Sequence, residues 1–212
     1  MLFVCDVQEK FRAVTFQMPT VISSTNTMVG FLLIFYLCKH QYILCFPYQV
    51  SAAKLLNLPI VVTTQSSSRL GTTVSEITKN LEDALQVRSF DKMKFSMLVP
   101  EVEHHIINNI PERNCVLLCG IETHVCVLQT CLDLLEKGYD VHVVSDAVSS
   151  STSYDRSMAL TRMRQSGAFI TSVESSIFQL ADDASNPEFR GISKLIKEHR
   201  LMEAGFKNTA CI

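Results

Sequence analysis

The sequence predicts a doubly wound α/β domain, a three-layer sandwich in which a parallel sheet lies between two layers of helices. Two observations support this prediction. Short runs that are apolar almost throughout recur along the chain, and segments with helical periodicity lie between them. Strand, helix and strand in this order imply right-handed crossovers and parallel strands, whose carboxyl ends gather at one edge of the sheet. Side chains at the ends of the apolar runs are therefore the candidates for function.

The predicted strands are four runs of five or six residues. A strand that is covered by helices on both faces needs this nearly continuous apolar pattern. The first run contains a single carboxylate, Asp6, and Pro59 introduces the second. The four runs are Leu2–Val7, Ile60–Thr64, Cys115–Cys119 and Val141–Ser145.

The predicted helices have apolar residues at every third or fourth position and polar residues on the opposite side. Two of them are followed by a glycine, which commonly ends a helix because it adopts the left-handed conformation without strain. The three clearest are Thr123–Lys137, which ends before Gly138, Asp155–Gln165, which ends shortly before Gly167, and Phe189–Lys197.

One segment interrupts this alternation. Of the 20 residues from 31 to 50, 15 are apolar, but Lys39-His40-Gln41 and Pro47 break the run, which argues against a transmembrane helix. Omitting residues 30–50 would join Val29 to Ser51 on one uninterrupted helical face. We therefore expect residues 30–50 to be an amphipathic or β-like insert that leaves the crossover helix between the first two strands and lies outside the core.

Length and composition fit one domain and exclude several classes of protein. The chain has 212 residues, of which 47% are apolar and 19% charged, enough for a core and too little charge for disorder. We assign residues 1–198 to the domain and residues 199–212 to a C-terminal tail. The net charge of −2 argues against a dedicated nucleic-acid binder, which usually has a basic excess on one face.

The cysteines favour an intracellular protein. The chain has eight, but it has no Cys-x-x-Cys pair, and its six histidines do not lie at zinc-finger spacing. The first residues lack the features of a signal peptide. We therefore expect free thiols, most of them buried, in a cytoplasmic protein. A mitochondrial location would follow if an N-terminal leader is missing from the sequence.

Three residues at strand ends could carry chemistry. Asp6 closes the first run, where the commoner role would be a helix N-cap or a solvated strand end. Cys126 begins the helix after the third run, where the helix dipole and unpaired N–H groups favour a thiolate and could hold an oxyanion. Its alternative role is one more buried core cysteine. Lys92 is the third candidate, although most lysines are solvated and Lys94 competes for any role.

The remaining candidates are weaker. Glu122, His124 and His142 are single polar residues near strand ends, and His124 lies only two positions from Cys126, so the two do not face each other on a helix. The sequence has no Gly-x-Gly-x-x-Gly, no phosphate-binding loop and no Gly-x-Ser-x-Gly elbow. Nucleotide binding and serine hydrolysis lose support accordingly.

The set of candidates resembles the isochorismatase-like cysteine hydrolases, closest to the type 2 subgroup of the eukaryotic isochorismatase domain-containing proteins. The shared pattern is an Asp that closes the first strand, a Lys-x-x-x-Ser and a Gly-Ile-x-Thr-x-x-Cys before a helix. The resemblance covers about residues 2–29 and 51–198. Its most specific segments are Cys5–Phe11 (CDVQEKF), Lys92–Ser96 (KMKFS), Cys119–Leu135 and Arg162–Phe169 (RMRQSGAF).

This resemblance implies a parallel sheet of about six strands, and it assigns roles by motif position. Cys126 would be the nucleophile, Asp6 the general base and Lys92, rather than the next lysine, the third member of a triad. In the family the bond equivalent to Ile121–Glu122 is cis, which would aim the N–H groups of Glu122 and Cys126 at an oxyanion. The implied reaction is hydrolysis of a small amide or related compound through a thioester. We also expect a homo-oligomer.

Departures from the family narrow this expectation. Nicotinamidase-type members carry an Asp-x-His metal site after the second strand, where this chain has Thr63–Ser68 (TTQSSS), so we expect no metal, no cofactor and no nicotinamidase activity. Members that hydrolyse isochorismate lack the nucleophilic cysteine, so Cys126 argues against that reaction. An imperfect gene model would explain both the insert and the absence of the family's usual leader. The alternative function is a catalytically idle α/β domain that serves as a protein-interaction partner.

Overall fold

The computed structural model describes residues 1–43, 58–82, 86–111 and 113–207. Within these ranges six strands form one sheet in the order β3-β2-β1-β4-β5-β6, and every neighbouring pair is parallel. The strands are β1 (Leu2–Cys5), β2 (Ile60–Gln65), β3 (Val87–Lys92), β4 (Cys115–Ile121), β5 (Asp140–Ser149) and β6 (Phe169–Thr171).

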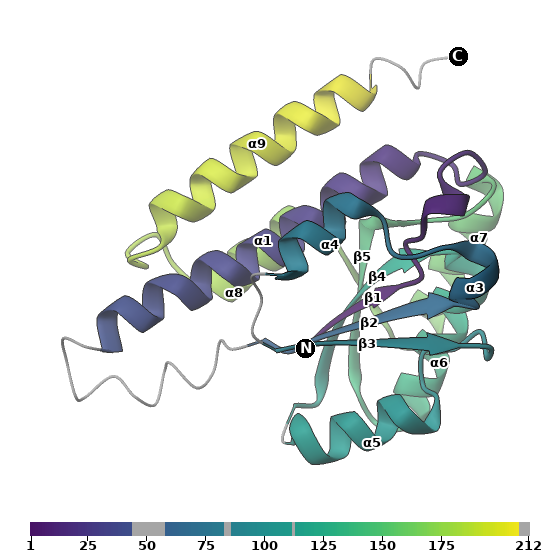
Figure 1. Ribbon diagram of the computed structural model, residues 1–212. Helices are drawn as coiled ribbons and strands as arrows, with labels where there is room; N and C mark the ends of the chain where they lie inside the picture. The colour runs from purple at the N-terminus through teal and green to yellow at the C-terminus, as the bar shows by residue number, and fades with distance from the viewer. Residues whose placement is uncertain (44–57, 83–85, 112, 208–212) are drawn as a thin grey trace.

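Helices cover both faces of the sheet (Figure 1), so the predicted three-layer α/β fold is confirmed. One layer contains α1 (Met18–Ile43), α4 (Ser75–Glu82), α8 (Val173–Ala181) and α9 (Phe189–Lys207). The other contains α5 (Pro100–Asn109), α6 (Leu128–Glu136) and α7 (Ser153–Gln165). Three short turns lie at the ends of strands: η1 (Glu9–Phe11), α3 (Ser67–Leu70) and η2 (Thr123–Val127).

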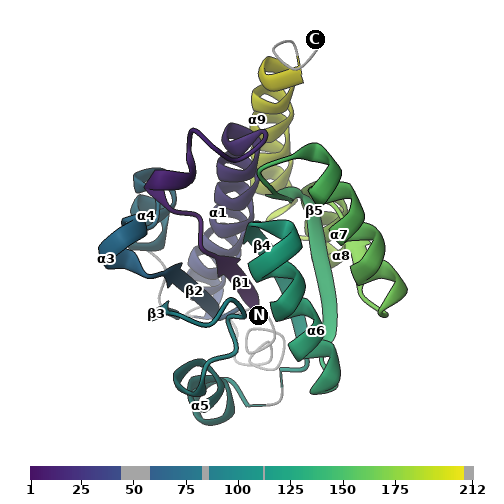
Figure 2. The same ribbon diagram turned by 90° about the vertical axis from the view of Figure 1, so that its right-hand side faces the viewer.

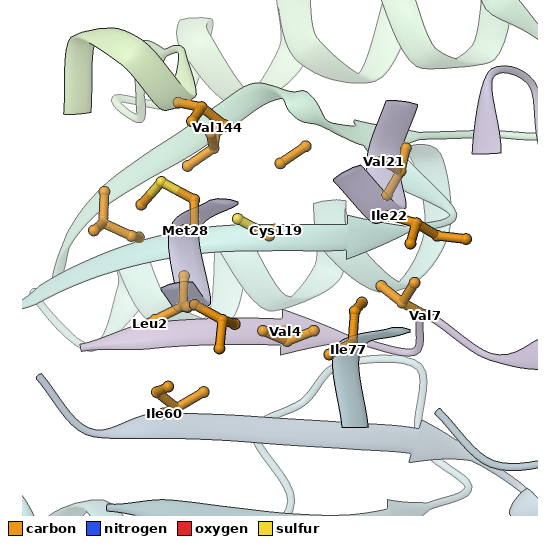
Figure 3. Close-up of a cluster of buried hydrophobic side chains, with 14 of the residues drawn as sticks. Leu2, Val4, Val7, Val21, Ile22, Met28, Ile60, Ile77, Cys119 and Val144 are labelled. Atoms are coloured by element: carbon orange, nitrogen blue, oxygen red, sulfur yellow. The ribbon is translucent and has the colours of Figure 1, made fainter. Parts of the chain in front are cut away.

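The core has two halves, because alternate side chains of a strand point to opposite faces of the sheet. Leu2 and Val4 of β1 pack with Cys119 of β4 against the α1 layer (Figure 3). Phe3 and Cys5 of β1 belong to the other half, which packs against α5 and α6. Cys5 and Cys119 therefore lie on opposite faces of the sheet.

The strand order has its topological switch point beside β1. From β1 the chain moves outward through β2 and β3, then returns to the other side of β1 and moves outward through β4, β5 and β6. In sheets of this kind ligands bind where the order reverses, outside the carboxyl ends of the strands. That position lies between β1 and β4, and Figure 2 looks onto this edge.

Several element boundaries differ from the sequence prediction. No long apolar run marks β3 or β6, because these two strands lie at the edges of the sheet, and most of their residues are exposed or half-buried. Strand β5 continues past Ser145 to Ser149, because after a register shift Val148 and Ser149 pair with Gly120 and Ile121 of β4. The helix predicted over Thr123–Lys137 begins as the π-turn η2 before it becomes α6.

Residues 30–43 are helical and continue α1 without interruption. The expectation that the chain leaves the crossover helix at residue 30 in an amphipathic or β-like segment is therefore wrong for this part, and the rest of the segment, residues 44–50, lies outside the described residues. Among the helices described, none has the length and apolar content that a membrane span requires. At the other end, α9 continues to Lys207 and His199 is buried, so the boundary expected at residue 198 falls inside a helix.

Deleting residues 30–50 is expected to leave the melting temperature unchanged or raised. Helix α1 contributes Met28 and Val29 to the core, and joining Val29 to Ser51 keeps the helical phase. The deletion also removes an apolar segment, so solubility should improve. Thermal unfolding followed by circular dichroism measures the effect. Loss of cooperative unfolding would show instead that the segment belongs to the core.

Candidate active site

Asp6 and Lys92 form a buried ion pair at the carboxyl edge of the sheet. Lys92 is the last residue of β3, and its Nζ donates to Asp6 Oδ2 at 2.7 Å. The two side chains are 0% and 2% exposed for Lys92 and Asp6. Asp6 is thus neither a helix cap nor a solvated strand end. Because two charges buried from water need close partners, this pair requires a dense set of hydrogen bonds around it.

Strand β2 lies between β1 and β3 and supplies those hydrogen bonds. Thr63 Oγ1 donates to Asp6 Oδ1 at 2.8 Å, and Gln65 Oε1 accepts from Lys92 Nζ at 2.7 Å. The carbonyl oxygens of Lys94 and Phe95 also accept from Lys92 Nζ, at 3.1 and 2.8 Å. Both carboxylate oxygens of Asp6 and the ammonium of Lys92 are therefore held in a fixed orientation.

Thr63 and Gln65 were not predicted as site residues, although the sequence carried a usable signal. Both lie at the carboxyl end of the second predicted run, and parallel strands bring such ends together. The stretch lacks an Asp-x-His metal site, and its uncharged hydrogen-bonding residues match no catalytic motif. Lys94, the competing lysine, lies outside the cluster and donates to Asp133 Oδ2 at 2.8 Å on the surface.

Cys126 reaches the same cluster through Cys5. The Cys5 thiol donates to Asp6 Oδ2 at 3.6 Å, and the Cys126 side chain lies near enough to interact with it. Cys126 is 6% exposed and belongs to the same half of the core as Cys5. The structure therefore brings all three predicted site residues, from the ends of β1, β3 and β4, to one place, with Cys5 in contact with two of them.

Thr130 ties the cysteine turn to the loop that follows Lys92. Its Oγ1 donates to the carbonyl oxygen of Cys126 at 2.6 Å and accepts from the N–H of Met97 at 2.9 Å. Cys126 itself lies in the π-turn η2, where Leu128 N–H bonds to the carbonyl of Thr123. Single π-turns of this kind are frequent at functional sites, because the extra residue redirects the side chains at the start of a helix.

The Ile121–Glu122 bond is trans, since the described residues contain no cis peptide bond. The expected cis bond is therefore wrong for this structure. The chain turns instead at Glu122, whose φ of 28° lies in the left-handed region that side chains rarely adopt. This rotation about N–Cα redirects the backbone between β4 and η2 without a cis bond. The assignment of the Glu122 and Cys126 N–H groups to an oxyanion site stays a prediction.

Glu122 and His124 lie together beside this turn. Glu122 Oε2 is 3.3 Å from His124 Nδ1, which lies 3.0 Å from Ser150 Oγ at the end of β5. Burial raises the pKa of Glu122, and the nearby His124 opposes this shift. His142, by contrast, pairs in register with Leu117 within the sheet and stacks on Phe169, so it lies away from the site.

Four of the other cysteines have weakly acidic thiols. Burial raises the pKa of Cys131 to about 12 and also raises the pKa of Cys115. Burial raises the pKa of Cys119 and Cys5 as well, and for Cys5 the hydrogen bond to Cys126 and the charge of Asp6 act in the same direction. None of these four thiols is favoured as a thiolate at neutral pH.

Comparison with known proteins decides the family. A family model for the isochorismatase domain matches residues 47–175. Isochorismatase domain-containing protein 2 of Xenopus laevis is 42% identical over 197 residues, which cover 93% of this chain and 83% of the relative. The chain belongs to the isochorismatase family. The resemblance drawn from the strand-end motifs is thereby confirmed.

Two further relatives have more specific names. A Phytophthora sojae protein named secreted isochorismatase effector Isc1 is 70% identical over 211 residues, 100% of this chain and 90% of the relative. A solved structure described as the MAR1 ribonuclease of Caenorhabditis elegans is similar with a TM-score of 0.76 and 38% identity, covering 92% of this chain and 88% of that one. One of these names mentions secretion and the other a ribonuclease. The cytoplasmic location and the absence of a nucleic-acid partner therefore stay predictions for this chain.

Gly120, which opens the Gly-Ile-x-Thr-x-x-Cys motif of this isochorismatase-family chain, allows β4 to approach β1. A Cβ at this position would lie 2.2 Å from the carbonyl oxygen of Cys5, and its φ is +137°. Gly120→Ala should therefore destabilise the fold at the site. Gly167 provides the control, because its φ is +105° but no atom lies within 4 Å of an added Cβ.

We expect Gly167→Ala to lower the free energy of unfolding by about 1–2 kcal/mol from backbone strain alone. Gly120→Ala should cost a further amount of about 1–3 kcal/mol, because strands β1 and β4 must move apart. Urea unfolding of both variants measures the difference. Equal costs would mean that the close approach to Cys5 does not constrain the site.

Proposed function

We propose that this chain is a hydrolase that cleaves a small amide or related compound with Cys126, Asp6 and Lys92 as its catalytic triad. The observation that carries the proposal is the buried Asp6–Lys92 ion pair. Only the Cys5 side chain lies between this pair and the Cys126 thiol. Burying an ion pair is costly, and a hydrophobic pair of similar volume would serve stability as well. A catalytic role accounts for its retention at the carboxyl edge of the sheet.

In the proposed reaction, Asp6 accepts the proton of the Cys126 thiol, and the thiolate attacks the carbonyl carbon of the substrate. The N–H groups of Glu122 and Cys126 stabilise the resulting oxyanion. The carbon–nitrogen bond then breaks as the leaving amine takes the proton from Asp6, which leaves a thioester on Cys126. Water, deprotonated by Asp6, hydrolyses the thioester to the carboxylic acid and restores the thiol.

Lys92 and Thr63 act on Asp6 in this scheme. They donate to its two carboxylate oxygens, so the carboxylate keeps one orientation while it gains and loses the proton. The fixed positive charge of Lys92 also stabilises the negative charge as it passes between the Asp6 carboxylate and the Cys126 sulfur. Gln65 and the two loop carbonyls position the ammonium in turn.

A panel of carboxamides, esters and ureas tests the proposal with the purified full-length chain. We expect hydrolysis of at least one member and a covalent adduct on Cys126 in acid-quenched samples. The panel includes a single-stranded RNA, because the Caenorhabditis elegans relative is described as a ribonuclease. Cleavage of RNA with no small-molecule turnover would replace the proposal. No turnover of any member, with an unreactive Cys126, would favour the idle interaction domain.

The proposed hydrolysis needs no metal. The cluster around Asp6 consists of Thr63, Gln65, Lys92 and two thiols, and in the described ranges no three His, Cys, Asp or Glu side chains gather as metal ligands. We expect the rate on the best panel substrate to be unchanged by prolonged dialysis against a chelator. Elemental analysis of the active protein is the second measurement. Stoichiometric zinc or iron, with activity lost on its removal, would contradict the expectation.

We also propose a cytoplasmic location, supported by five described cysteines with free thiols, as a reducing compartment favours. The Phytophthora sojae relative is named a secreted effector, so secretion is the competing outcome. Fractionation of cells that express the tagged natural gene, with assay of the culture medium, distinguishes the two. Tag in the medium without cell lysis would overturn the cytoplasmic assignment.

The proposed homo-oligomer is supported by exposed apolar side chains on α7. Tyr154 and Met158 lie one turn apart and are 71% and 51% exposed. Neighbouring apolar side chains of this kind commonly mark a protein contact. Light scattering after size exclusion measures the state. A monomeric mass at high protein concentration would contradict this part of the proposal.

A further inference from the structure

Cys5 is a buried thiol that the proposed hydrolysis does not use. It is the last residue of β1 and is fully buried. Its Sγ lies 3.6 Å from Asp6 Oδ2, and it interacts with the Cys126 side chain in the same half of the core. The site therefore holds two thiols in contact with each other and a carboxylate beside them. A two-electron oxidant can join two neighbouring thiols as a disulfide, and a base beside them can take up the proton.

We propose that Cys5 and Cys126 form a redox pair, in which a peroxide oxidises Cys126 and Cys5 then captures it as an intramolecular disulfide. The disulfide switches hydrolysis off reversibly, because it occupies the sulfur that would attack the substrate. It also protects Cys126 from irreversible oxidation to sulfinic acid. This inference rests on the proposed function, since it takes Cys126 as the reactive thiol.

The chemistry balances in two steps. The Cys126 thiolate attacks one oxygen of hydrogen peroxide, the O–O bond breaks, and sulfenic acid and hydroxide form; the hydroxide takes up a proton to give water. The Cys5 sulfur then attacks the sulfenic sulfur and gives its proton to Asp6. The S–O bond breaks, and the departing hydroxide takes this proton from Asp6 and leaves as a second water. Peroxide is reduced by two electrons, and the two thiols are oxidised to one disulfide. A dithiol reductant then reduces the disulfide back to the two thiols.

The surroundings of Cys5 suit a resolving cysteine. Burial, the hydrogen bond to Cys126 and the charge of Asp6 all raise its pKa, so it stays protonated and does not compete with Cys126 for substrate or peroxide. When Cys126 carries a sulfenic acid, Asp6 is the base within reach of the Cys5 thiol. Cys119 lies on the opposite face of the sheet and cannot take this part.

The test exposes the full-length protein to hydrogen peroxide, with alkylation of free thiols before and after reduction. We expect the intact mass to fall by two hydrogen atoms and a link between Cys5 and Cys126. Trypsin leaves Cys115, Cys119, Cys126 and Cys131 in one peptide, residues 114–137, so fragmentation must locate the linked sulfur. Cys5→Ala is the test variant, and Cys119→Ala is the control that removes a buried thiol from the other face.

After peroxide and then dithiothreitol, the wild-type chain and Cys119→Ala should recover more than about half of their own untreated rates on the best panel substrate, and Cys5→Ala less than about a tenth. The wild-type mass spectrum decides the case even if Cys5→Ala fails to fold. Suppose that the untreated protein hydrolyses a substrate, but peroxide gives a sulfinic acid on Cys126 and leaves Cys5 as a free thiol. This result would overturn the redox pair and leave the proposed hydrolase standing. If the protein hydrolyses no substrate, and neither peroxide nor the alkylating agent modifies Cys126, the proposed function is overturned instead.

Discussion

Cys126→Ala is expected to fold normally and to hydrolyse the best panel substrate at least about 10⁴-fold more slowly than the wild type. The substitution removes one sulfur atom from a largely buried position, so the change in melting temperature should be small. Without the thiolate no thioester can form, and the remaining hydrogen-bond donors give only weak catalysis. Steady-state kinetics and thermal unfolding of the same preparation measure both effects. Full activity in this variant would end the cysteine-hydrolase proposal.

Thiol labelling tests the same triad without a substrate. At pH 7 iodoacetamide should alkylate Cys126 first, because Cys5, Cys115, Cys119 and Cys131 all have raised pKa values. Lys92→Ala should slow this labelling, since it removes a positive charge from the cluster. Equal labelling rates at all cysteines would contradict an activated thiol.

Asp6→Asn separates thiol reactivity from turnover. The variant should leave Cys126 open to alkylation yet abolish hydrolysis, because an amide cannot accept the thiol proton. Rapid turnover by this variant would show that another group is the general base. Together with Cys126→Ala, it distinguishes the loss of a nucleophile from the loss of a base.

The central strands of the fold were predictable from sequence because burial on both faces leaves a recognisable apolar run in each of them. Strands β1, β2, β4 and β5 are covered by helices on both faces, so each carries a nearly continuous apolar run. In edge strand β3 five of the six residues are exposed or half-buried, and polar and apolar residues are mixed, a pattern that a loop can also have. Its existence followed only from the family resemblance, which implied about six strands.

The site was predictable in its residue types and not in its contacts. Asp6 and Cys126 lie at the ends of predicted strands of one parallel sheet, whereas the choice of Lys92 over Lys94 came from the family resemblance. The partners Thr63 and Gln65 are uncharged and ordinary in sequence, and only the β1–β2–β3 order gives them their role. The trans bond before Glu122 and the contact of Cys5 with Cys126 depend on backbone rotations that no residue pattern encodes.

Lys92→Met is expected to cost about 3–5 kcal/mol of the free energy of unfolding, because it leaves the Asp6 carboxylate buried without its charged partner. It also removes the donor from Gln65 Oε1 and from two carbonyl oxygens. Lys94→Met is the matched control. Lys94 pairs with Asp133 on the surface, half exposed, so its replacement should cost less than about 1 kcal/mol.

The double variant Asp6→Asn/Lys92→Met separates the ion pair from simple packing. It removes both charges, so it should regain part of the stability that Lys92→Met loses, although neither variant can hydrolyse a substrate. Urea unfolding of the wild type, Lys92→Met, Asp6→Asn and the double variant gives the coupling energy between the Asp6 and Lys92 side chains, and Lys94→Met is measured beside them. If Lys92→Met costs no more than Lys94→Met, or if the double variant is less stable than additive losses predict, the buried pair does not hold the site together, and the orientation of Asp6 must come from Thr63 and the strand itself.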